Sequence, residues 1–164
     1  MGLDISVSKI KEVSEDFYGE EGGYTVNEDF KEHSKNLDEH KFYDQDGDRL
    51  YHFHAGAYSG YGQWRRLLCD LYYKINVNEF WNNYDDYASK PFSEIINFSD
   101  CEGIIDWEMS AKLYKDFADN RQLLKSRLKE YTGVLSENRF FDLYDDFMKA
   151  FMLASENKAC VLYH

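Results

Sequence analysis

The feature that most restricts the fold is a change in the spacing of apolar residues near Ser59. In residues 3–7 every second side chain is apolar, the pattern of a half-buried strand. In residues 64–71 the apolar side chains recur at i, i+3, i+4 and i+7, the pattern of an amphipathic helix. These apolar positions are Leu3, Ile5 and Val7, and then Trp64, Leu67, Leu68 and Leu71.

The rest of the chain extends both patterns. Asp46-Gly47 between the aromatic-rich runs 42–43 and 50–54 predicts a central β-hairpin, because glycine accepts a positive φ without steric cost. Asp106 is typical of a helix N-cap and precedes a long helix that Gly133 ends or interrupts. Further helices are expected over 79–87 and around the apolar residues of 140–151, and a closing strand over 160–163.

This order of elements predicts an α+β fold. A small antiparallel or mixed sheet, made of the N-terminal strand, the hairpin and the C-terminal strand, would pack against four or so helices. At 164 residues, with 18% aromatic side chains and one proline, residues 1–164 are expected to form a single domain. Residues 12–39 are polar and glycine-containing, which predicts a long irregular or mobile excursion with a short strand at Tyr24–Val26.

The net charge of −12 restricts the possible partners. Nonspecific nucleic-acid binding depends on Lys and Arg neutralising phosphates, so general DNA or RNA binding is not expected. The three cysteines are widely spaced and form no CxxC pair, which favours a reducing compartment. The sequence has neither the pattern of a signal peptide nor a run of 18 apolar residues, so we expect a cytoplasmic protein without membrane contact.

The glycine-rich segment 54–62, which leads from the expected strand into the expected helix, is the first candidate site. Glycines allow backbone N–H groups to approach an anion, the helix start adds partial positive charge, and Arg65 and Arg66 add full charges. Tyr58, Tyr61 and Trp64 could stack on a planar group. The spacing matches neither a Walker A loop nor a dinucleotide fingerprint. The alternative interpretation is a tight strand-to-helix connection capped by Ser59.

Two further segments contain groups that could carry chemistry. His52 and His54, at i and i+2 of a strand, point to the same face and could share a metal ion if a third ligand joined them. The turn 99–103 places Cys101 between two carboxylates, which suppress the thiolate, so the cysteine needs a histidine beside it to act as a nucleophile. Candidates for the third metal ligand are Asp100, Cys101, Glu102 and His164.

Aromatic residues are more abundant in residues 72–87 than a small core requires. The group in question is Tyr72, Tyr73, Trp81, Tyr84 and Tyr87. Part of this surface could face a partner or a second copy of the chain, so a homo-oligomer is a possible state.

Three segments resemble a family of small uncharacterised proteins from bacteriophages and bacterial genomes. They are Met-Gly-Leu-Asp-Ile at the start, His-Ala-Gly-Ala-Tyr-Ser-Gly-Tyr-x-x-Trp-Arg from His54, and Ile-Asn-Phe-Ser-Asp-Cys-Glu-Gly from Ile96, followed by Ser110-Ala111-Lys112-Leu113. The resemblance covers most of the chain apart from residues 12–39. It implies a phage or prophage setting and a host-takeover or anti-defence role, but no catalytic residue.

The leading hypothesis is a nonenzymatic, phage-type binding protein for a phosphate-bearing small molecule such as a nucleotide signal, with no cofactor. Its expected ligand-binding residues are His54, Gly56, Tyr58, Ser59, Gly60, Tyr61, Trp64, Arg65, Arg66, Asp100 and Glu102. One alternative is a small hydrolase that uses His52 and His54, with or without a metal. The other is an acidic protein that blocks the basic surface of a host nucleic-acid-binding protein.

Overall fold

The computed structural model describes residues 2–17, 23–131 and 137–164. Its strands are β1 (Leu3–Ser8), β2 (Ile10–Val13), β3 (Tyr24–Thr25), β4 (Phe42–Gln45), β5 (Tyr51–Gly56), β6 (Gly103–Ile105) and β7 (Cys160–Tyr163). Its α-helices are α1 (Tyr58–Tyr73), α2 (Val77–Asn82), α3 (Tyr84–Tyr87), α4 (Ser93–Asn97), α5 (Trp107–Leu128) and α6 (Glu137–Asn157). Two 3-10 helices, η1 (Glu15–Phe17) and η2 (Glu28–His33), lie between β2 and β4.

The main sheet has the strand order β5-β1-β7-β6, and all of its neighbouring strands are antiparallel. The strands from the two ends of the sequence, β1 and β7, therefore pair at its centre, with Ile5 opposite Tyr163. This confirms the predicted N-terminal strand, the closing strand and the α+β class. A second sheet has the order β2-β4-β3.

The central hairpin prediction is wrong, because β4 and β5 belong to different sheets. β5 pairs with β1 and β4 pairs with β2, so residues 42–56 run antiparallel to residues 3–13 along two successive strands. The Leu50 amide donates to Val7 O and the Asp46 amide to Lys9 O, both at 2.8 Å. Residues 46–49 therefore protrude between the two pairings, and Gly47, at φ 80°, allows the protrusion without reversing the chain.

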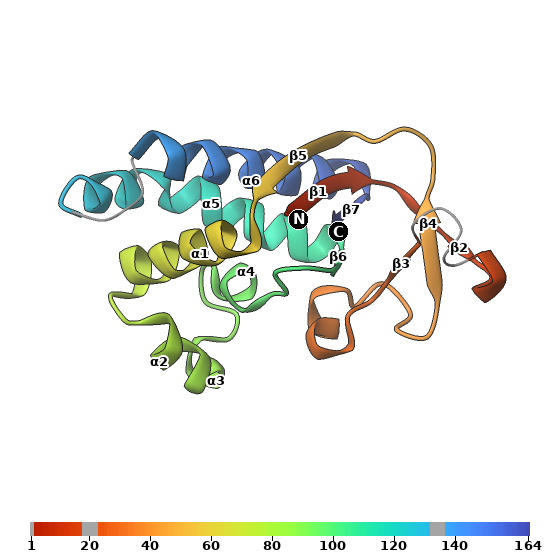
Figure 1. The fold of residues 1–164 in the computed structure, drawn as a ribbon, viewed down its shortest axis with the longest axis horizontal. Coiled ribbons are helices and arrows are strands. Elements are labelled where there is room, and N and C mark those ends of the chain that lie inside the picture. The colour runs from red at the N-terminus through yellow and green to blue at the C-terminus, as the bar shows by residue number, and fades with distance from the viewer. Residues whose placement is uncertain (1, 18–22, 132–136) are drawn as a thin grey trace.

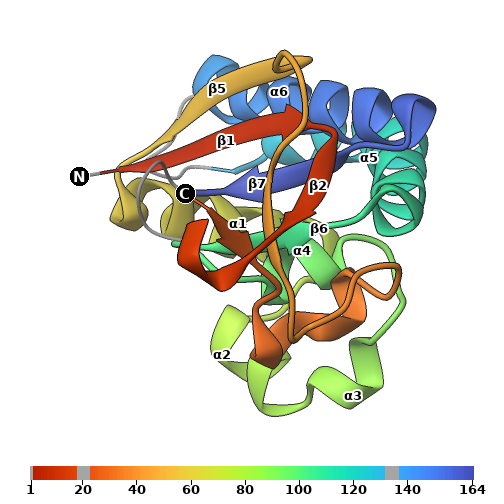
Figure 2. The ribbon, with the colours of Figure 1, turned by 90° about the vertical axis from the view of Figure 1, so that its right-hand side faces the viewer.

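β7 is buried on both faces because layers pack against each side of it. Val161 and Tyr163 belong to the large core beneath the helices, whereas Cys160 and Leu162 pack with Val26 from the second layer. Figure 1 shows α5 and α6 as long neighbouring helices with α1 alongside. Figure 2 shows the second sheet and the α5–α6 pair on different sides of β7.

The helix predictions are confirmed with some changes of extent. Asp106 caps α5 by accepting a hydrogen bond from the Met109 amide at 2.9 Å. The helix expected over 79–87 is divided into α2 and α3. β6 is a strand that the apolar pattern did not predict, and Gly133 lies outside the described residues. In the described ranges, none of the helices is both long and apolar enough to cross a membrane.

The described part of residues 12–39 contains short regular elements that pack against the core. The short strand expected at Tyr24–Val26 is confirmed as β3. The Ser34 hydroxyl donates to Ile104 O, and the buried His33 ring lies beside α4, with its Nε2 3.3 Å from Glu94 O. The excursion is thus anchored by buried polar side chains.

Most of the aromatic side chains in residues 72–87 pack inside the molecule. Four of these rings pack against the large core: Tyr72, Tyr73, Tyr84 and Tyr87. Tyr73 also donates to Pro91 O at 2.6 Å. Trp81 remains 36% exposed, although its Nε1 donates to Ile96 O at 3.3 Å. The aromatic group is therefore mainly an extension of the core.

Candidate functional site

The connection between β5 and α1 turns sharply at Gly56, whose φ of 97° favours glycine. The cap position of α1 is Ala57, which provides no side-chain hydrogen bond. The predicted alternative of a Ser59 cap is therefore wrong, because Ser59 lies inside the first turn. An α-helix leaves its first amide groups without intrahelical partners, so the start of α1 presents N–H donors with no side-chain cap.

This connection lines a cavity of about 550 Å³, which we call the loop groove. The groove lies between the start of α1 and the first half of α6. A Cβ built on Gly60 would meet no atom within 4 Å, so the groove is open there. Its lining residues are His54, Ala55, Gly56, Ala57, Ser59, Gly60, Gln63, Trp64, Arg139, Asp142, Leu143 and Asp146.

The loop groove contains groups of both charge signs. Arg139 brings a positive charge from α6, and the same helix contributes the carboxylates of Asp142 and Asp146. The Tyr51 hydroxyl donates to Asp146 Oδ1 at 2.6 Å, and burial together with this carboxylate raises the pKa of Tyr51 to about 12. Cations can hold a phosphate, and carboxylates accept hydrogen bonds from hydroxyl or amino groups.

His54 connects the groove to the outer face of the main sheet. Its Nδ1 lies 2.9 Å from Asp4 Oδ1, and this hydrogen bond lowers the pKa of the Asp4 carboxyl. A Cβ on Gly2 would come within 2.4 Å of His54 Cε1 and within 2.9 Å of Gly56 O. Asp4 therefore orients the imidazole at the edge of the groove, and the lack of a side chain at Gly2 leaves room for the ring.

The structure does not support Tyr61 and Trp64 as stacking surfaces for a ligand. Tyr61 is 0% and Trp64 1% exposed, so neither presents a ring face to solvent. The Trp64 indole donates to Phe140 O at 3.2 Å and forms part of the groove floor, and the Tyr61 hydroxyl lies 3.3 Å from that of Tyr163. The expectation was wrong because these residues belong to the buried stripe of α1.

Arg65 is also a structural residue. Its side chain is 7% exposed and its Nη1 donates to Phe98 O, with Ile96 O at 3.4 Å. Asp100, whose side chain is 51% exposed, lies 3.5 Å from its Nη2. Arg65 therefore holds the segment before the turn 99–103 and is not placed to hold a phosphate in the loop groove.

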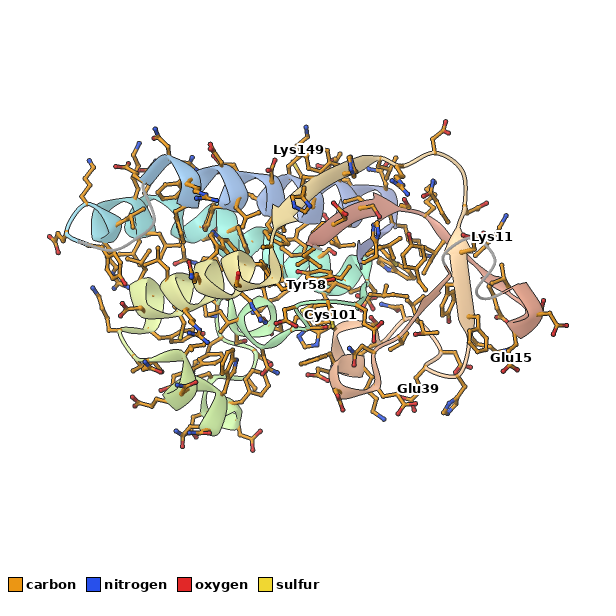
Figure 3. The ribbon with its side chains drawn as sticks, viewed as in Figure 1. Lys11, Glu15, Glu39, Tyr58, Cys101 and Lys149 are labelled. Atoms are coloured by element: carbon orange, nitrogen blue, oxygen red, sulfur yellow. The ribbon has the colours of Figure 1, made fainter. Side chains whose placement is uncertain are left out.

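The turn 99–103 faces a different cavity. Tyr58 and Glu102 line it together with Cys101 and His164, and its volume is about 280 Å³. Figure 3 labels Tyr58 and Cys101, which lie close together in that view. The single pocket expected from the loop, the helix start and the turn is thus divided into this Tyr58 cavity and the loop groove.

The Tyr58 cavity brings a thiol and an imidazole to one place. His164 Nε2 lies 3.1 Å from the buried Ser6 hydroxyl. Burial, with Arg49 nearby, lowers the pKa of His164, so this imidazole is neutral near pH 7. In residues 2–17, 23–131 and 137–164, no three His, Cys, Asp or Glu side chains are grouped so that they could hold a metal ion.

The residues missed by sequence reasoning are on α6. Arg139, Asp142 and Asp146 follow each other at i, i+3 and i+7, which places them along one side of the helix. These residues form a polar stripe next to the apolar stripe of α6. The sequence pattern contains both stripes, but the prediction used only the apolar residues. No family model, curated protein or solved structure matches the chain, so the role of the groove is inferred from its chemistry and placement.

Proposed function

We propose that the protein is a nonenzymatic binding protein for a small phosphate-bearing molecule, a nucleotide in particular, and that the loop groove is its site. The observation that carries the proposal is that the first turn of α1, which has no side-chain cap, lines the same cavity as Arg139. A helix start and an arginine together form a favourable environment for a phosphate.

The other wall of the groove suits the rest of a nucleotide. The carboxylates of Asp142 and Asp146 can accept hydrogen bonds from ribose hydroxyls or from amino groups of a base. This assignment replaces Asp100 and Glu102, which lie away from the groove, and places the phosphate at Arg139 in place of Arg65 or Arg66.

The charge of the whole molecule makes the local cations important. A net charge of −12 repels anions at long range, so a phosphate binds only where fixed donors and cations outweigh that field. This arrangement suits a small ligand that enters a cavity and disfavours a polyanion that spreads over the surface. The resemblance to bacteriophage proteins supports a setting in the cytoplasm of an infected cell, where the bound molecule would be a nucleotide signal.

Thermal unfolding with a panel of mono-, di- and cyclic nucleotides tests the proposal, with the matching nucleosides as phosphate-free controls. A ligand present at 100 times its Kd stabilises the native state by about 2.7 kcal/mol, which is roughly 5–10 °C for a chain of this size. Nucleotides should raise the midpoint and nucleosides should not. A midpoint that no nucleotide moves would contradict the proposal.

Two glycines of α1 provide a matched pair of variants. Gly60 lines the loop groove and Gly62 does not, and an added Cβ meets nothing within 4 Å at either position. G60E should place a carboxylate in the groove and abolish nucleotide binding, whereas G62E adds the same charge to the same helix and should leave binding intact. Equal losses in both variants would show that the groove is not the site.

A further inference from the structure

A second cavity lies farther along α1 than the loop groove. This Arg66 cavity has a volume of about 520 Å³ and is lined by Arg66, Leu67, Asp70, Lys74 and Tyr131, among others. Gln63 lines both cavities, so they are neighbours that share one wall residue. Resting on the proposed function, we infer that the two cavities form one elongated site and that the ligand consists of two nucleotide units.

The two cavities repeat the same chemistry. In the loop groove, Arg139 is accompanied by Asp142 and Asp146, and in the Arg66 cavity, Arg66 and Lys74 are accompanied by Asp70. Each therefore offers at least one cation for a phosphate and at least one carboxylate for hydroxyl or amino groups. A repeated set of groups fits a ligand built of two similar halves.

The length of α1 sets the spacing between the two halves. The helix rises about 1.5 Å per residue, so Gly60 and Arg66 are separated by about 9 Å along its axis, and Gly60 and Lys74 by about 21 Å. One phosphate cannot reach the helix start and these two cations at the same time. A ligand that uses both cavities therefore needs a second anionic group on the order of 10 Å from the first.

Apolar and aromatic groups complete the second cavity. Leu67, 5% exposed, continues the floor that Trp64 begins in the loop groove. Tyr131 is 41% exposed and lines the Arg66 cavity, so its ring can stack on a base. Tyr61, in contrast, is buried. The C-terminal end of α1 carries partial negative charge, so the side chains of Arg66 and Lys74 must supply the attraction for the second phosphate.

Isothermal titration calorimetry can compare 5′-phosphorylated dinucleotides of each base with the matching mononucleotides. Because linking two binding units raises affinity, the best dinucleotide should bind at least about 100-fold more tightly than its mononucleotide. R66Q and K74Q should remove this advantage, so that the dinucleotide binds about as weakly as its mononucleotide. K9Q, which removes the same charge from an exposed residue outside both cavities, should change neither affinity.

The outcomes separate this inference from the function on which it rests. If mononucleotides bind as tightly as dinucleotides, or if R66Q and K74Q leave the dinucleotide advantage intact, the two-unit ligand is wrong and the loop groove alone is the site. If G60E abolishes mononucleotide binding in the same experiment, the proposed function stands. If no nucleotide of either length binds, both proposals fail.

Discussion

The Asp106 carboxylate joins two parts of the chain that are 70 residues apart, because its Oδ2 accepts hydrogen bonds from both the backbone and the side-chain nitrogen of Asn36, each at 3.0 Å. Its Oδ1 caps α5 at the Met109 amide. Asp106 is 1% exposed, so its carboxylate is buried, whereas Asn36 lies at the surface. One side chain thus starts α5 and anchors the excursion that precedes β4.

We therefore predict that D106A destabilises the protein by about 3 kcal/mol, since it removes a helix cap and leaves the Asn36 donors without their charged partner. For a chain of this size the midpoint should fall by roughly 6–12 °C in thermal unfolding followed by circular dichroism. D106N retains a side-chain oxygen that can cap the helix, so it should lose less stability than D106A. A midpoint for D106A equal to that of the wild type would mean that these contacts add no stability.

Segments dominated by one local pattern could be predicted from the sequence. The strand β1 and the Asp106 cap of α5 depend on neighbouring residues, and both are confirmed, although β1 is not half-buried because Ser6 and Ser8 are buried as well. The hairpin failed because Asp46-Gly47 permits a turn but does not choose the partner strand. β1 and β2 follow each other along the chain and pair with β5 and β4, respectively. Together they form more strand pairing than β4 and β5 could form with each other.

The candidate site was predictable only on the side where its residues are adjacent in sequence. The segment 54–62 lines the loop groove, but Arg139 and Asp146 come from α6, more than 70 residues later. No local signal connects residues that meet only through tertiary packing. The same limit explains Arg65, whose charge suggested a ligand although its acceptors are the backbone carbonyls of Ile96 and Phe98.

A buried ionic group supports the loop before α4. Lys112 Nζ contacts Glu94 Oε2 and lies 2.8 Å from Asp116 Oδ2, which also accepts the Phe92 amide. Glu94 and Asp116 have side chains only 5% and 10% exposed. Burial raises the pKa of Asp116, and Lys112 opposes that rise.

K112M should therefore be strongly destabilising, by about 3–5 kcal/mol, because it leaves two carboxylates buried without their cation. Urea unfolding measures the loss. Lys115, on the same helix, pairs with Asp119 at the surface, where its side chain is 75% exposed, so K115M is the matched control and should change little. Equal effects of the two substitutions would contradict a special role for the buried group.

The three cysteines should differ sharply in reactivity. Cys101 is exposed beside the Tyr58 cavity, whereas Cys69 and Cys160 are buried, and burial raises the pKa of each buried thiol to about 12. Because the thiolate is the reactive form, iodoacetamide at pH 8 should add one group to the native protein and three in denaturant, by mass spectrometry. C101S should remain unlabelled in the native state. Rapid labelling of Cys69 or Cys160 in the native protein would contradict the burial of these two thiols.

His33 should make stability depend on pH. Its ring is 0% exposed, and burial lowers its pKa below the usual 6.5, although Glu32, Glu94 and the Phe30 carbonyl favour the charged form. The folded state therefore keeps the ring neutral where the unfolded chain protonates it. As the pH falls below 6.5, the unfolded state gains a proton that the folded state lacks, and the free energy of unfolding decreases.

A comparison of wild type with H33Q isolates this contribution, because most other titrating groups are common to both proteins. Relative to H33Q, the free energy of unfolding of the wild type should decrease by up to about 1.4 kcal/mol for each pH unit below 6.5. The decrease ends where the ring takes up a proton in the folded state. Urea unfolding at intervals between pH 7.5 and 5 measures it. Stability curves that stay parallel would mean that His33 takes up its proton at the same pH in the folded and unfolded states, which would contradict a pKa lowered by burial.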